Sequence, residues 1–174
     1  MNMNQTDNKQ NTTVSIRNAV MSDLSAILNI EKLGFTAEEA GSKSQYLERL
    51  KKLKETFLVA VVNEQVVGFI VGPVVQENKV ADWMYEEIHE QDIVGGNQMV
   101  LTIAVDPAFQ GFHIGTQLLE ALYSIAKAQN RNTIALTCLE KNILFYEKNG
   151  YKNNGQSLSN HAGEIWYDLT KTIK

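Results

Sequence analysis

The 174-residue chain lacks several features that mark particular classes of protein. Its 16 lysines and arginines are outnumbered by 20 aspartates and glutamates, giving a net charge of −4, and they form no basic stripe for nucleic acid. No apolar run reaches the roughly 18 residues of a membrane-spanning helix. The polar start of the chain also lacks the apolar core of a signal peptide. We therefore expect neither a nucleic-acid partner nor a membrane partner.

Cysteine and histidine are also scarce, with one cysteine, Cys138, and three histidines. A single cysteine excludes an internal disulfide, and we expect a cytoplasmic protein in a reducing compartment. The four side chains are too few and too scattered to predict a metal site. Cys138 ends the alternating run TIALTC, where a buried small residue is typical. A nucleophilic Cys–His pair stays open from the sequence alone.

What is present fits an ordinary globular protein, with 44% hydrophobic and 21% charged residues. We expect a disordered polar tail over residues 1–12 and a single domain over 13–174. Periodicity predicts a strand, two helices, a β-hairpin over 56–71, a strand over 99–105 and a helix to about 128. A strand over 133–138, a helix over 141–149 and two further strands follow. This alternation predicts an α/β fold.

The most informative stretch is LTIAVDPAFQGFHIGT, residues 101–116. Gly111 and Gly115 stand between an apolar strand and an amphipathic helix. The first N–H groups of such a helix, and the positive end of its dipole, suit a phosphate or pyrophosphate. On the glycines alone, a strand–turn–helix joint without any ligand is equally compatible.

The order of elements resembles that of the GCN5-related N-acetyltransferase (GNAT) superfamily over residues 14–170, with QGFHIG at 110–115 and FYEKNGY at 145–151. Within it the chain resembles the arylalkylamine N-acetyltransferase group, in EEA at 38–40, WMYEEIHEQ at 83–91, TIAVDPAFQG at 102–111 and Cys138 before FYEKNGY. The resemblance implies a GNAT fold with a mixed, twisted sheet of about six to seven strands flanked by about four helices. It also implies acetyl-CoA as the acetyl donor.

The resemblance also assigns residues that would contact coenzyme A. The strand backbone would contribute Ile103 and Val105. The loop amides of Gln110, Gly111, Phe112, His113, Ile114, Gly115 and Thr116 would bind the pyrophosphate. The helix predicted over 141–149 would line the arm and thioester end, through Asn142, Phe145 and Lys148.

One of these positions departs from the family motif, which reads Gln/Arg-x-x-Gly-x-Gly/Ala. Gln110 and Gly115 match it, but His113 replaces the middle glycine. Histidine still offers its amide, and a negative φ there would leave the pyrophosphate site undisturbed. A ring that points to solvent and a weakened affinity for acetyl-CoA are the two consequences left open.

The resemblance further implies catalytic roles. Tyr146 matches the tyrosine that acts as general acid, and a phenol with a pKa of about 10 keeps its proton at neutral pH; position alone also allows a core aromatic. The two histidines of serotonin acetyltransferases correspond to Met99 and Leu101, so that base is absent. Glu39, or its neighbour Glu38, lies where related insect enzymes carry a glutamate base. A solvated acid at the start of a helix, with a water chain as base, is the alternative.

Three further residues, Phe35, Met84 and Tyr85, belong to segments that fold over the acceptor in this family, which implies an apolar, aromatic pocket. We therefore expect an N-acetyltransferase that acts on a small hydrophobic or aromatic amine by direct attack in a ternary complex. A peptide or protein amine as acceptor, and a non-catalytic acyl-CoA-binding regulatory protein, are the alternatives. A homodimer is compatible with the resemblance, although no residue identifies an interface.

Overall fold

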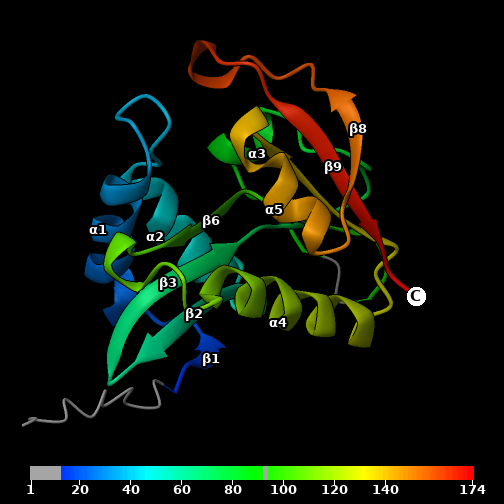
Figure 1. Cartoon of the computed structure of the whole chain (residues 1–174). Helices are drawn as coiled ribbons and strands as arrows, with labels where there is room; N and C mark the ends of the chain where they lie inside the picture. The colour runs from blue at the N-terminus through cyan, green and yellow to red at the C-terminus, as the bar shows by residue number, and fades with distance from the viewer. Residues whose placement is uncertain (1–12, 92–93) are drawn as a thin grey trace, which may run out of the picture.

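The computed structural model describes residues 13–91 and 94–174 (Figure 1). The tail predicted over residues 1–12 lies outside this range. None of the helices that the described residues form has the length and apolar content needed to cross a bilayer.

The strands of the described residues form two sheets, with orders β1-β2-β3-β6 and β4-β5-β7-β9-β8. The strands are β1 (Ser15–Asn18), β2 (Phe57–Val62), β3 (Gln65–Val71), β4 (Val74–Val75), β5 (Asn97–Val100), β6 (Thr102–Val105), β7 (Thr133–Cys138), β8 (Lys152–Gln156) and β9 (Tyr167–Thr172). The helices are α1 (Leu24–Gly34), α2 (Lys43–Lys52), α3 (Trp83–Glu86), α4 (Ile114–Ala128) and α5 (Ile143–Lys148).

The hairpin predicted over residues 56–71 is confirmed. Val62 pairs with Gln65, so Asn63 and Glu64 alone form the turn. Their φ angles are 48° and 65°, and positive values at both positions are the geometry that matches the twist of two paired strands. Every residue of β2 but one is fully buried, which agrees with a strand that is covered on both faces.

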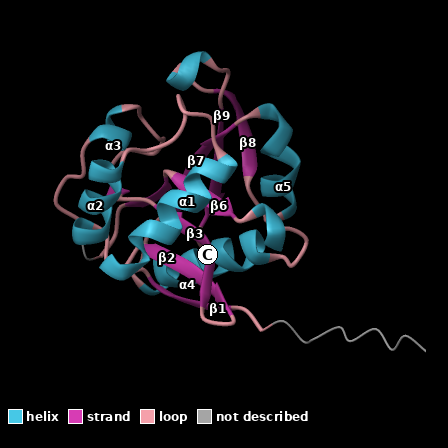
Figure 2. Ribbon diagram, turned by 90° about the vertical axis from the view of Figure 1, so that its left-hand side faces the viewer, coloured by secondary structure: helices cyan, strands magenta, loops and turns pink. Residues whose placement is uncertain are grey.

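Helices cover both faces of the strands. Figure 2 shows α2 and α3 on one side and α5 on the other. Apolar residues of α1, α2 and α3 form one core cluster with Phe57, Val59 and Phe69. The apolar face of α4, together with Tyr146 of α5, forms a second cluster with alternate residues of β2 and with Val67 and Ile70 of β3.

The strand predicted over residues 99–105 is divided at Leu101. Leu101 donates its N–H to the Val71 carbonyl oxygen at 2.9 Å, and Thr102 is the residue paired with Val71, so two residues oppose one in a β-bulge. Before the bulge β5 pairs with β7, and after it β6 pairs with β3. A Cβ on Gly72 would lie 1.8 Å from the Met99 carbonyl oxygen, so the crossing needs glycine there.

This division corrects one part of the predicted architecture. The α/β GNAT fold is confirmed, but the described residues form nine strands in sheets of four and five rather than one sheet of about six to seven. The bulge leaves no trace in the hydrophobic pattern, because Leu101 continues the apolar run and is itself buried.

Candidate active site

The division of the sheet leaves backbone groups of β6 without a strand partner. Asp106 donates its N–H to the Val67 carbonyl oxygen at 2.7 Å. Because hydrogen-bonded pairs alternate along an antiparallel ladder, the backbone groups of Ile103 and Val105 point away from β3. On their other side no strand is paired with β6, since the pairing of β7 with this segment of the chain ends at Val100 of β5. Ile103 and Val105 therefore present free donors and acceptors to the gap between β6 and β7.

A cavity of about 620 Å³, which we call the larger cavity, runs from β6 along the start of α4. Its lining comprises Ile103, Ala104, Val105, Phe109, Gln110, Gly111, His113, Ile114, Gly115, Thr116, Asn142, Phe145, Tyr146, Lys148 and Asn149. This set includes the residues predicted to contact coenzyme A except Phe112, which is 46% exposed on the outside of the loop. The structure thus brings the strand, the loop and α5 together around one space.

The loop before α4 is built on left-handed backbone. Gly111 has φ 89°, and His113, the residue that caps α4, has φ 57°. The φ of His113 is therefore positive, not the negative value under which an undisturbed pyrophosphate site was predicted. Histidine adopts this region more readily than most residues, and its ring is exposed. The left-handed backbone explains why the family motif has glycine at this position.

Gly115 acts through packing rather than backbone conformation. A Cβ on Gly115 would lie 3.1 Å from Cζ of Phe145, closer than ordinary van der Waals contact. The glycine therefore allows the Phe145 ring to pack directly on the first turn of α4. This contact joins α4 and α5 across the larger cavity.

A second cavity of about 250 Å³, which we call the smaller cavity, lies on the other side of the gap between β6 and β7. The α1–α2 loop, α3, the start of β6, the end of β7 and the β8–β9 loop all contribute to it. Ile103, Asn142 and Tyr146 line both cavities. The two spaces therefore meet beside Tyr146, and a group held in one can reach a group held in the other.

Tyr146 is 7% exposed and packs edge-on against Phe145 and Tyr151, with ring centroids 5.0 Å and 5.9 Å away. Burial raises its pKa well above the ordinary value for a phenol, and nearby Cys138 adds to this rise. The phenol therefore keeps its proton at neutral pH. A protonated hydroxyl at the junction of the two cavities is placed to give a proton to a group that forms there.

Cys138 lies in the smaller cavity but has the wrong environment for a nucleophile. It is 3% exposed, and burial raises its pKa to about 12. The sulfur stays a thiol at neutral pH, whereas attack requires the thiolate. Among residues 13–91 and 94–174, no group of three or more metal-ligating side chains occurs.

Glu39 lies in the α1–α2 loop and lines the smaller cavity. Partial burial raises its pKa, and the neighbouring carboxylate of Glu164, from the β8–β9 loop, raises it further. Glu38 also lines this cavity and is exposed. Both candidate bases therefore reach the cavity.

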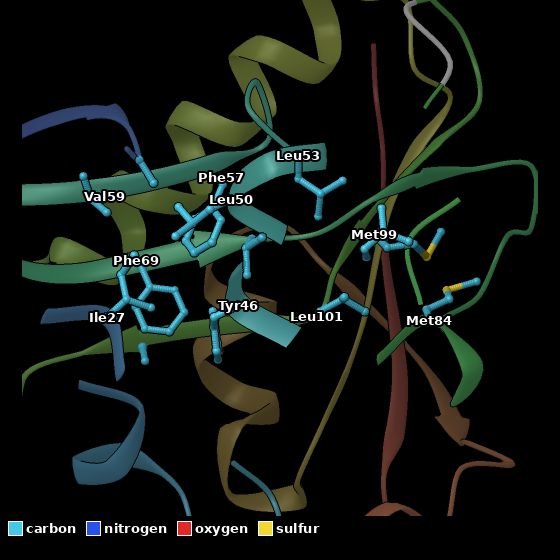
Figure 3. Close-up of a cluster of buried hydrophobic side chains, with 14 of the residues drawn as sticks. Ile27, Tyr46, Leu50, Leu53, Phe57, Val59, Phe69, Met84, Met99 and Leu101 are labelled. Carbon is cyan, nitrogen blue, oxygen red and sulfur yellow. The ribbon is translucent and has the colours of Figure 1, made fainter. Parts of the chain in front are cut away.

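The three residues predicted to contact the acceptor are divided by the structure. Phe35 and Tyr85 line the smaller cavity, whereas Met84 does not. Met84 is fully buried and packs in the core with Met99 and Leu101 (Figure 3). The single turn of α3 points Met84 inward and Tyr85 toward the cavity, since neighbouring residues of a helix face different directions.

Sequence reasoning missed the side chains that cover the smaller cavity. His161 stacks on Tyr85, with ring centroids 5.2 Å apart and planes at 4°, and its Nε2 lies 3.4 Å from the Glu39 carbonyl oxygen. Trp166 donates its Nε1–H to the His161 carbonyl oxygen at 2.8 Å. His161 belongs to a polar stretch without periodicity, and Trp166 was predicted only as part of a strand, so nothing in the sequence placed either residue at the cavity.

Two buried charged residues, Glu31 and Arg49, also line the smaller cavity and were missed. Here a signal was available. Glu31 follows Ile27 by four residues and Arg49 follows Tyr46 by three, so each occupies the apolar face of its helix. A charged residue at such a position is an exception that calls for a partner.

Comparison with known proteins gives one family and several relatives. The model of the acetyltransferase (GNAT) domain matches residues 54–153. An N-alpha-acetyltransferase of Saccharolobus solfataricus is 30% identical over 142 residues, which cover 79% of this chain and 80% of the relative.

Solved structures agree in fold. The GphF GNAT-like decarboxylase in complex with isobutyryl-CoA has a TM-score of 0.78 and 16% identity, covering 92% of this chain and all of its own. Arabidopsis thaliana Naa50 in complex with the bisubstrate analogue CoA-Ac-MVNAL has a TM-score of 0.69 and 18% identity, covering 91% of this chain and 98% of its own. At these identities the two likenesses establish the fold alone.

The geometry of the loop predicts the effect of replacing His113. His113→Gly should raise the free energy of unfolding by about 0.5–1 kcal/mol, because relief of left-handed strain exceeds the entropy cost of glycine. It should also bind acetyl-CoA at least as tightly as the wild type, since no Cβ then faces the loop amides. Urea unfolding and calorimetric titration measure the two effects.

His113→Ala is the matched control, because it removes the imidazole but keeps the Cβ and the strain. His113→Ala should show neither a higher free energy of unfolding nor a tighter binding of acetyl-CoA. Equal stability and equal affinity in the glycine and alanine variants would contradict the backbone explanation.

Proposed function

The chain belongs to the acetyltransferase (GNAT) family, and we propose that it transfers the acetyl group of acetyl-CoA to the α-amino group at the N-terminus of a peptide or protein. Family membership and the relatives make the chain an N-acetyltransferase. The observation that carries the choice of acceptor is the 30% identity to an N-alpha-acetyltransferase over about four-fifths of both chains. The GNAT assignment from the sequence is confirmed, whereas the narrower arylalkylamine resemblance and the small-amine acceptor stay predictions.

The larger cavity fits the donor, acetyl-CoA. The free backbone groups of Ile103 and Val105 can pair with the amides of the pantetheine arm, as a further strand would. The loop from Gln110 to Gly115 ends in the first turn of a 15-residue helix, which favours the pyrophosphate. Lys148 on the same cavity supplies a positive charge. The thioester would then lie at the junction beside Tyr146.

The proton chemistry of the smaller cavity also supports an α-amino acceptor. An α-amine has a pKa of about 8, so about a tenth of it is already neutral at pH 7. An alkylamine with a pKa of about 10 is neutral only to about a thousandth. Met99 and Leu101 replace the histidine base, so only carboxylates remain as candidate bases, and of Glu38 and Glu39 it is Glu39 whose pKa burial and Glu164 raise. An acceptor that needs little help to lose its proton suits this site.

The proposed reaction proceeds without a covalent enzyme intermediate, because the Cys138 thiol is not ionised. The acceptor ammonium gives a proton to Glu39, directly or through water, and its nitrogen attacks the thioester carbonyl carbon. The N–C bond forms, the C–S bond breaks, and the leaving sulfur takes the proton of the Tyr146 hydroxyl. The nitrogen then loses its second proton, which restores the Tyr146 hydroxyl, and the proton on Glu39 passes to solvent. The negative charge that develops on the carbonyl oxygen is stabilised by the N–H group of Ile103, the β6 residue that lines both cavities, while Val105 and the Ile103 carbonyl oxygen remain for the pantetheine arm.

A small amine remains the second candidate because the smaller cavity is compact and covered. Its volume is about 250 Å³, and the β8–β9 loop contacts both Tyr85 and the α1–α2 loop over it. A peptide needs these loops to admit a chain, whereas a small amine fits within them.

A panel of acceptors separates the two candidates. We expect kcat/KM for short peptides with a free N-terminus to exceed that for 2-phenylethylamine by about tenfold or more. Thiol release measures the rate, and mass spectrometry of the product locates the acetyl group. The control is the same peptide with a blocked N-terminus and a free lysine, which should not react. A faster reaction with the small amine would contradict the proposal, and acetyl-CoA binding without thiol release for any amine would indicate the regulatory alternative.

Tyr146→Phe tests the general acid. We expect kcat to fall by about 100-fold or more, because the leaving thiolate loses its proton donor, while the Kd for acetyl-CoA stays within about twofold. Stopped-flow or steady-state thiol release gives kcat, and calorimetry gives the Kd.

Tyr151→Phe is the matched control for Tyr146→Phe. Tyr151 is also a buried tyrosine of the same core cluster, but it lines neither cavity. It should retain kcat, and equal losses in the two variants would point to packing rather than proton transfer.

The pH dependence of kcat tests Glu39. A base must be ionised, and burial together with Glu164 raises the pKa of Glu39, so kcat should fall on acidification at a higher pH than an ordinary glutamate would give. Glu164→Gln removes a neighbouring negative charge, lowers the pKa of Glu39 and should shift this fall to lower pH. Glu38→Gln, which changes an exposed residue of the same cavity, should leave the profile in place. An unchanged profile in both Glu164→Gln and Glu39→Gln would contradict the role of Glu39.

A further inference from the structure

Two charged side chains are buried at the α1–α2 end of the smaller cavity without pairing. Glu31 is 3% exposed and Arg49 is 2% exposed, and both line the cavity. Within the described residues neither has an oppositely charged group within 4.0 Å. The other charged residues of the α1–α2 loop and α3 that line the cavity, Glu38, Glu39 and Glu86, are exposed or half-exposed. Glu31 and Arg49 are therefore the charges that an occupant would meet away from water.

Their hydrogen bonds to the protein are incomplete. Glu31 accepts the Gly41 N–H on Oε1 at 2.9 Å, while its Oε2 and the neighbouring Tyr46 hydroxyl are both buried without a hydrogen-bond partner. Arg49 donates from Nη2 to the Tyr85 carbonyl oxygen at 3.2 Å, one of its five N–H donors. Its guanidinium also lies 4.8 Å from the centre of the Tyr46 ring. A buried charge with unused hydrogen-bonding capacity is unfavourable unless another group supplies it.

The opposite charges of Glu31 and Arg49 on one cavity wall restrict the chemistry of a ligand group that could bind to both. A carboxylate would be attracted by Arg49 and repelled by Glu31. An ammonium group would be attracted by Glu31 and repelled by Arg49. An apolar side chain would leave both charges unsatisfied. A carboxamide satisfies both, since its oxygen accepts from Arg49 and its NH₂ group donates to Glu31 Oε2. A hydroxyl has a single proton to donate and satisfies fewer of these atoms.

We propose that Glu31 and Arg49 select an acceptor that carries a carboxamide next to its amine, as in a peptide that begins with asparagine or glutamine. This inference rests on the proposed N-terminal acceptor and names its first side chain. The amine lies toward Tyr146, and the carboxamide lies toward α1 and α2. Glu31 and Arg49 are specificity-determining residues and take no part in proton transfer.

Three peptides that differ only in their first residue test the inference, because asparagine, aspartate and leucine have the same branched shape. For the wild type we expect kcat/KM for the asparagine peptide to exceed that for each of the others by about tenfold or more. Arg49→Met should reduce the advantage of asparagine over leucine to about twofold or less. A wild type that prefers leucine or aspartate, or does not discriminate, overturns the inference.

Glu31→Gln provides a change of preference that a structural role would not produce. It keeps the shape of the side chain and removes the repulsion of a carboxylate, so kcat/KM for the aspartate peptide should rise about tenfold relative to the asparagine peptide. Glu86→Gln, at an exposed position of the same cavity, should leave the ratio unchanged. An unchanged ratio in folded Glu31→Gln, or an equal loss for all three peptides with a lower Tm, overturns the inference.

The outcome of this test is separate from that of the proposed function. If all three peptides react equally, the N-terminal acceptor stands and the carboxamide preference fails. If no peptide reacts but small amines do, the N-terminal acceptor fails. The carboxamide preference is then tested with small acceptors, the amides of asparagine, aspartate and leucine, by the same ratios of kcat/KM. If Arg49→Met does not fold, Arg49→Lys, which keeps the charge, takes its place in this comparison.

Discussion

The active site depends on one feature of the backbone, the point at which a strand leaves one sheet for another. At the bulge of Leu101 and Thr102 the strand stops pairing with β7 and begins to pair with β3. Gly72 has no side chain, so its backbone can lie in contact with that of Met99. Beyond the bulge Ile103 and Val105 keep free hydrogen-bonding groups that a regular sheet would use. In the interior such groups need partners, and in the proposed function the amides of the acetyl donor supply them.

The sequence predicted those parts of the fold that depend on local pattern. The run TIALTC forms β7 over the predicted residues, and Asn63-Glu64 forms the predicted hairpin turn. The glycine-bearing loop and Tyr146 could be placed because a motif fixes their spacing, and both line the larger cavity. The division at Leu101 could not be predicted, because a bulge is a matter of hydrogen bonding and leaves hydrophobicity unchanged.

Side chains that meet only through tertiary structure were beyond the reach of the sequence. Met84 and Tyr85 are neighbours in the chain, yet one packs in the core and the other faces the smaller cavity. His161 reaches Glu39 across more than a hundred residues. Glu31 and Arg49 were within reach, since each stands on the apolar face of its helix, where a charge conflicts with the pattern.

The small overlap between the two cavities has an evolutionary consequence. Only Ile103, Asn142 and Tyr146 border both, while most of the smaller cavity comes from α1, α2 and the loop between them, α3, the strand ends and the β8–β9 loop. Under the proposed assignment of donor and acceptor to the two cavities, substitutions in those segments can therefore change the acceptor without disturbing the donor. Gene duplication followed by drift in the loops would yield enzymes with new acceptors and the same acetyl donor, so a lineage can diversify at one substrate while selection preserves the other.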